Sequence, residues 1–143
     1  MQIKKALERL QNDKAILGKN FTFEPDTIDH ALLDTGESVY WVRNETGRWL
    51  SVDVASEEVF LFEEVEEEID IEEEVVVFQN RDFEFTYEGI GTLVDDDGVE
   101  LESVHFKDYE GDGDVLRVVA SEVTGDQMVS IGRVVAESEI SEV

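Results

Sequence analysis

The 143-residue chain carries 37 acidic and 11 basic side chains, which gives a formal net charge of −26. This charge argues against binding to nucleic acids and to anionic membranes, because both are polyanions that would repel the protein. It favours attraction to a basic protein surface or to a polycation such as a polyamine. The chain has no cysteine, which excludes disulfides and thiolate chemistry.

The first 20 residues differ from the rest, since they hold five basic and only two acidic side chains. Ile3, Leu7 and Leu10 recur at helical spacing, so we expect a short amphipathic helix that stops near Gly18. One interpretation is a helix that caps one end of a barrel, with its basic face on the acidic body. The other is a detachable arm that contacts a partner or a membrane surface. Membrane contact is expected only through this segment.

Beyond Pro25 the hydrophobic pattern changes to a period of two, which is typical of strands. Phe83, Phe85 and Tyr87 alternate with polar residues, so the three aromatic rings are expected on one face of a sheet. The apolar blocks 59–62 and 75–78 have no such alternation and predict strands that are buried on both faces.

Residues 63–74 are almost entirely acidic, and we expect an edge strand or a joint between two halves, where like charges block edge-to-edge pairing. The apolar residues of this stretch that could pack are Val65, Ile69 and Ile71. Turn signals separate the predicted strands, and they lie at 44–47, 79–80, 95–98, 111–113 and 124–126.

This pattern predicts an all-β fold of nine or ten antiparallel strands, arranged as a sandwich or barrel. We expect one acidic β domain over residues 21–143, preceded by the basic helix or arm of residues 1–20. Val54-Ala55-Ser56-Glu57 recurs as Val119-Ala120-Ser121-Glu122. The repeat suggests two similar sheets or half-barrels, over 28–72 and 73–143.

Several segments, taken in order, resemble a prokaryotic family of unknown function. The matching segments are Arg48-Trp49-Leu50-Ser51-Val52, Asp82-Phe83-Glu84-Phe85-Thr86-Tyr87, Gly89-Ile90-Gly91-Thr92, Val104-His105-Phe106-Lys107-Asp108-Tyr109, Gly132-Arg133-Val134-Val135 and Ser138-Glu139-Ile140. The resemblance covers residues 28–143 and implies two similar β-rich halves. Family members are often encoded beside homologues of phage-shock protein A and beside polyamine-synthase-like genes, which implies a role in envelope stress. The family has no established catalytic residues, so none are transferred to this chain.

Catalytic groups are scarce in the sequence. The only histidines are His30 and His105, and neither lies near a glycine-flanked serine of the kind used as a nucleophile. Two histidines without cysteine are too few for a zinc site. An enzyme is therefore not expected, and a hydrolase that acts through carboxylates alone is only a third alternative.

The strongest candidate for a metal site is the cluster of Asp108, Glu110, Asp112 and Asp114, with Gly113 at its sixth position. Oxygen ligands at alternate positions around a glycine suit Ca²⁺. Position twelve of such a loop would be Val119 instead of the usual glutamate. Two interpretations remain open, an acidic hairpin turn and a weak divalent-cation site; no other cofactor is expected.

Trp41 and Trp49 flank the predicted turn at 44–47 and are expected near one another, either packed in the core or exposed as a stacking platform. The carboxylates are expected to form a solvated shell around an aromatic β interior. The leading functional prediction is a non-catalytic, cytoplasmic interaction module that recruits a basic partner, and the alternative is a divalent-cation or polyamine-binding protein. The acidity also fits a salt-loving organism. The sequence leaves the partner and the oligomeric state open.

Overall fold

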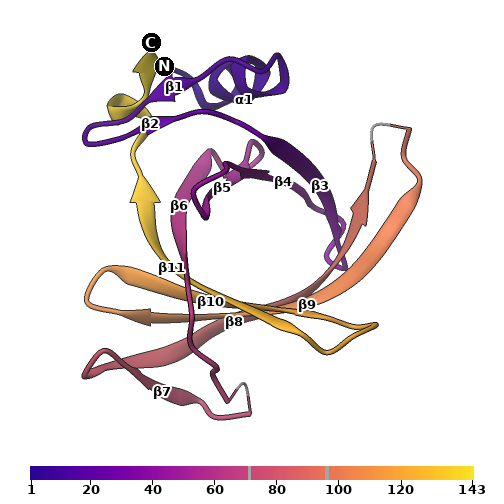
Figure 1. Cartoon of the computed structure of the whole chain (residues 1–143), viewed down its shortest axis with the longest axis vertical. Coiled ribbons are helices and arrows are strands. Elements are labelled where there is room, and N and C mark those ends of the chain that lie inside the picture. Colours follow the sequence, from indigo (N-terminus) through magenta and orange to yellow (C-terminus); the bar gives the residue numbers. More distant parts are fainter. Residues whose placement is uncertain (71, 96) are drawn as a thin grey trace.

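The computed structural model describes residues 1–70, 72–95 and 97–143. It is mostly β, as the sequence predicts. Within the described residues, eight strands close an antiparallel barrel in the order β3-β4-β5-β6-β11-β10-β9-β8, and β8 pairs again with β3. Figure 1 shows this ring of strands, with the helix and both chain ends on its outside.

The barrel consists of two four-stranded meanders joined at two seams. The first contains β3 (Thr27–Leu33), β4 (Ser38–Arg43), β5 (Arg48–Asp53) and β6 (Glu58–Val65). The second contains β8 (Arg81–Val94), β9 (Glu100–Gly111), β10 (Asp114–Ser121) and β11 (Gln127–Val135). At one seam Phe62 of β6 faces Gly132 of β11, and at the other Ala31 of β3 faces Leu93 of β8.

A small cap covers the outer wall of the first meander. It contains α1 (Ile3–Gln11), the 3-10 helix η1 (Glu137–Glu139) and a three-stranded sheet of β12 (Ser141–Glu142), β1 (Ile16–Leu17) and β2 (Thr22–Phe23). The apolar face of α1 joins a cluster with the outward-facing Val42, Leu50 and Val52. The helix therefore lies against the side of the barrel, not over its end. No described helix is long and apolar enough to cross a membrane.

Helix α1 is shorter than the sequence suggests, and the predicted stop near Gly18 is wrong. It ends at Gln11, followed by the cap residue Asn12, whose side-chain amide Nδ2 donates to the Glu8 carbonyl at 2.8 Å. Asp13 then adopts a left-handed backbone with φ of 58°, which breaks the helical hydrogen-bond pattern. The released chain continues into β1.

Inside the barrel, alternate residues of each strand point inward. On β5, Leu50 and Val52 face outward beneath the cap, so Trp49, Ser51 and Asp53 face the interior. Ser51 and Asp53 thus face into the barrel, while Leu50 and Val52 pack against the cap.

Strand β7 (Val75–Phe78) lies outside the closed ring and pairs only with β8 in the described sheet. Its two faces differ, because Val76 and Phe78 are buried while Val75 and Val77 are exposed. The prediction that this strand is buried on both faces is therefore wrong, since the edge strand extends beyond the barrel and its second face is exposed to solvent. In contrast, Val59 and Phe62 on β6 are both buried, one under the cap and one inside the barrel.

The acidic segment after β6 runs to β7 and links the two meanders. Within it Ile69 is buried against the outer face of the second meander, as expected for a packing residue. Its backbone amide and carbonyl bind the side chain of Gln127, at 3.4 and 3.2 Å. Ile71, also expected to pack, and Asp96, in the expected turn at 95–98, lie outside the described residues.

Strand β8 contains a register shift between Phe85 and Tyr87 where it pairs with β9. Phe85 contacts Tyr109 on the outer face, with ring centroids 6.3 Å apart, whereas Tyr87 contacts Phe106 inside the barrel at 5.8 Å. The prediction that these aromatic residues share one face is therefore wrong. A bulge changes the phase of the alternation and directs Tyr87 inward.

Candidate functional site

A cavity of about 420 Å³ opens at the end of the barrel that carries the β3–β4 and β5–β6 turns. Inward-facing residues of both meanders line it, so the closure of the barrel is what assembles it. Its aromatic wall consists of Trp41, Phe60, Tyr87 and Phe106. Its carboxylates are Glu37, Asp53, Glu58, Asp108 and Glu110. An eight-stranded barrel is wide enough to hold one small ligand in this way.

Arg117 lines the cavity as a buried residue and is held by an ion pair with Asp108. Its Nε and Nη2 donate to the two carboxylate oxygens at 2.7 and 2.9 Å, and its Nη1 donates to Ser51 Oγ at 3.1 Å. The guanidinium carbon lies 4.9 and 5.2 Å from the ring centres of Phe62 and Phe106. This bidentate, aromatic-lined contact fixes the arginine and neutralises its charge within the protein.

Two tryptophans pack beside this pair, which confirms the prediction that they lie together in the core. Trp41 and Trp49 are 1% and 2% exposed, and their rings meet edge to face at 5.6 Å. Trp49 Nε1 donates to the fully buried Ser130 Oγ at 2.9 Å. Trp41, which lines the cavity, has a buried Nε1–H with no acceptor among the described residues.

The mouth of the cavity is strongly acidic. Among the described residues that line it, Arg117 is the single basic side chain, and it is already paired with Asp108. The remaining carboxylates therefore have no cationic partner among the lining residues. Glu37, Glu58 and Glu110 are exposed where they line the cavity, in agreement with the expected solvated carboxylate shell, whereas Asp108 is buried in its pair with Arg117.

The pKa values of two lining residues reflect this environment. Burial raises the pKa of Glu58 above 4.5, the nearby Asp53 carboxylate raises it further, and Arg117 acts in the opposite direction. Burial also raises the pKa of the Tyr87 phenol, with further contributions from Asp34 and Glu37. Both shifts disfavour additional negative charge at the cavity mouth, as expected where carboxylates crowd together.

The four residues predicted to bind a divalent cation are not brought into one cluster. Asp108 holds Arg117 inside the barrel, and Asp114 pairs with Arg81 at 2.8 Å on the other side of the β9–β10 turn. Glu110 lines the cavity, while Asp112 lies in the turn with φ of 50°. The described residues contain no group of three or more His, Asp or Glu positioned to hold a metal ion. The calcium site stays a prediction to which this geometry adds no support.

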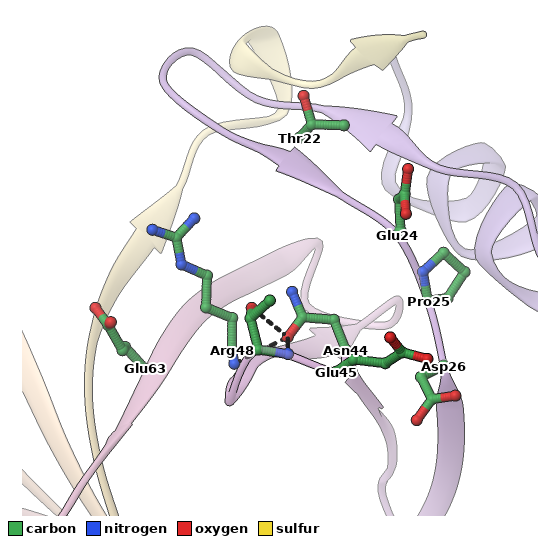
Figure 2. A pocket seen from close by; sticks show the side chains of 9 residues that line it. Thr22, Glu24, Pro25, Asp26, Asn44, Glu45, Arg48 and Glu63 are labelled. Carbon is green, nitrogen blue, oxygen red and sulfur yellow. Dashed lines mark hydrogen bonds between the residues drawn. The ribbon is translucent and has the colours of Figure 1, made fainter.

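A second hollow, shown in Figure 2, lies between the segment after β2 and the β4–β5 turn, with a volume of about 600 Å³. Asn44 Oδ1 organises the turn by accepting hydrogen bonds from the Thr46 and Arg48 amides at 2.9 and 3.0 Å. The side chains of Glu24 and Asp26 stand opposite. Polar side chains dominate this open surface and no aromatic ring lines it, so the barrel cavity is the stronger candidate site.

Sequence reasoning missed Arg117, although the sequence holds a signal for it. Arg117 interrupts an apolar run between Leu116 and Val118, and a charged residue within a buried strand requires a partner. Asp108, directly opposite on β9, provides that partner. Glu58, at the start of β6, joins these residues only through barrel closure, and the sequence near it carries no signal of this.

The chain matches none of the protein-family models, and searches of curated proteins and of solved structures return no match either.

Proposed function

We propose that this protein is a non-catalytic binding barrel whose cavity takes a small organic cation. The observation that carries the proposal is the combination of an acidic mouth, an aromatic wall and an arginine neutralised by its own aspartate. With Arg117 paired, the cavity offers an anionic ligand no free basic group. To an ammonium group, the cavity offers carboxylates as well as the faces of aromatic rings.

The lining favours an organic cation over a metal ion. Calcium requires six to eight oxygen ligands and magnesium retains a shell of water, so neither gains from an aromatic wall. An alkylammonium ion can place its charge near Asp53 and Glu58 while its carbon atoms contact Phe60 and Phe106.

Two further considerations agree with this proposal. Neither histidine belongs to the cavity lining, because His105 faces Glu88 at 3.3 Å and His30 stacks on Tyr40 at 4.5 Å. The site therefore has no histidine base for a nucleophile, which supports binding over catalysis. The sequence also resembles a family whose members are often encoded beside polyamine-synthase-like genes, and this resemblance implies the same expectation of an amine ligand.

Isothermal titration calorimetry with choline, spermidine and the neutral carbon isostere of choline tests the proposal. We expect saturable one-site binding of the cations and none of the isostere, in which a tert-butyl group replaces the trimethylammonium group. Glu58→Gln should weaken cation binding about tenfold, or ~1.4 kcal/mol. Glu122→Gln, at an exposed turn residue outside the cavity, is the matched control and should leave affinity unchanged. Equal losses in both variants, or uptake without saturation, would indicate counterion attraction by the whole surface and refute the site.

For the architecture, we propose that the two meanders are equivalent halves. Val54-Ala55-Ser56-Glu57 directly follows β5, the third strand of the first meander. Val119-Ala120-Ser121-Glu122 forms the end of β10, the third strand of the second meander, and the residue after it. Likewise, Val39–Trp41 and Val104–Phe106 belong to the second strand of each. A crystal structure in which β3–β6 do not superpose on β8–β11 in this register would contradict the proposal.

A further inference from the structure

Strand β7 ends the nine-stranded sheet and leaves one side open. A two-residue turn joins it to β8, and Gln79 and Asn80 both have positive φ, of 50° and 62°, as a tight hairpin requires. The register pairs Phe78 with Arg81 and Val76 with Phe83. The hairpin is therefore firmly anchored on its β8 side.

The outer edge of β7 presents unpaired backbone groups. In an antiparallel pair, hydrogen-bonded and non-hydrogen-bonded positions alternate. The Phe78–Arg81 pair that closes the two-residue hairpin is a hydrogen-bonded pair. Four residues before Phe78, the Phe85 amide donates to the Glu74 carbonyl at 2.8 Å. Every second pair is thus hydrogen-bonded, and the pairs of Val75 and Val77 are not. The amide and carbonyl groups of Val75 and Val77 therefore point away from β8, and no described backbone hydrogen bond outside the strand ladders reaches them.

The side chains of this edge combine apolar and acidic surface. Val75 and Val77 are 51% and 65% exposed. On the same face, their cross-strand neighbours are Glu84 and Asp82, both exposed. The edge has no lysine, proline or bulge, which are the features that usually prevent strand addition. Its protection is negative charge alone, and that repels a second copy of this chain but attracts a basic strand.

We infer that the edge of β7 docks an extended basic segment of a partner protein, which adds a strand to the sheet. Main-chain hydrogen bonds to Val75 and Val77 would supply affinity. Lysine or arginine stems on the incoming strand would lie over the two valines, and their charged ends would reach Asp82 and Glu84, two strand spacings or about 10 Å away. A segment that alternates basic and β-branched residues fits this surface. The surface is separate from the barrel cavity and does not depend on the ligand proposed there.

A capped eight-residue peptide of alternating lysine and valine is the probe, followed by ¹⁵N NMR titration of the full chain. We expect the Val75 and Val77 amides to shift and to become protected from hydrogen exchange. A peptide of alternating glutamate and valine, and one with the four lysines and four valines in separate blocks, should bind at least tenfold more weakly.

Val77→Pro is the decisive variant, because it removes an outward donor without removing a bond to β8. It should reduce peptide affinity at least tenfold, whereas Val77→Thr, which retains the amide, should remain within threefold of the wild type. Val77→Lys gives a second test that leaves the backbone intact, and it should also weaken binding by charge repulsion. Circular dichroism confirms that each variant is folded. Peptide binding that is insensitive to Val77→Pro and Val77→Lys, shifts spread evenly over the acidic surface, or self-association that Val77→Pro abolishes would each overturn the inference.

Discussion

Arg117 illustrates how a buried cation is retained in a chain with a large excess of acid. Its side chain and that of Asp108 are 8% and 12% exposed, so neither charge is well solvated. Removing one partner leaves the other buried and unpaired, which costs much more than replacing both. The pair therefore matters for stability as well as for the charge of the cavity.

We predict that Arg117→Met lowers the free energy of unfolding by about 3–5 kcal/mol. The double variant Arg117→Met/Asp108→Leu should recover most of this loss, because it leaves no uncompensated charge. Urea unfolding of the single and double variants forms a double-mutant cycle. Additive losses, without coupling between the two positions, would show that the ion pair does not stabilise the fold as described.

Glu58 gives the cavity a pH dependence whose sign follows from its raised pKa. The folded state binds the Glu58 proton more tightly than the unfolded chain, so stability is lost as the pH rises from 4.5 through the raised value. Glu58→Gln should therefore stabilise the protein at neutral pH and have little effect below pH 4.5. Urea unfolding at several pH values checks this. A stabilisation that is the same at every pH would contradict a titrating Glu58 as its source.

At the scale of elements, the β6–β11 seam depends on a glycine. A Cβ on Gly132 would lie 2.2 Å from the Leu61 carbonyl oxygen and 2.7 Å from Phe62 Cδ1, so the two strands would have to separate. Gly132→Ala should lower the free energy of unfolding by about 1–3 kcal/mol. Gly91→Ala is the matched control, because its nearest contact, Leu33 Cδ2 at 3.5 Å, is an ordinary one. Thermal denaturation compares the two, and equal melting temperatures would show that the seam tolerates the methyl group.

Local sequence patterns predicted most of the strands but not which face meets the interior. Short apolar blocks and turn residues gave the all-β class, because strand period and turn chemistry are local properties. The aliphatic face of β5 points outward and is buried because α1 packs over it. The opposite face of the strand, with Ser51 and Asp53, therefore meets the cavity. The bulge at Phe85–Tyr87 likewise reverses the expected orientation. Both depend on tertiary contacts that a periodicity of two cannot reveal.

At the scale of the whole molecule, the acidity has two structural components. Part of it forms the solvated surface that the sequence predicts, including the acidic link between the meanders. Another part gathers where the cavity opens, and there the exposed Glu58 and Glu110 come from strands far apart in the sequence. Composition alone cannot separate these components, because the net charge is the same for either distribution. Barrel closure creates the difference.

The edge-to-face contact of Trp41 with Trp49 has a practical consequence. These are the only two tryptophans of the chain; one lines the cavity and the other packs directly behind it. Essentially all intrinsic indole fluorescence therefore originates at the cavity wall. A cation that enters should alter the emission of the unlabelled protein, so ligand libraries can be screened optically without a dye.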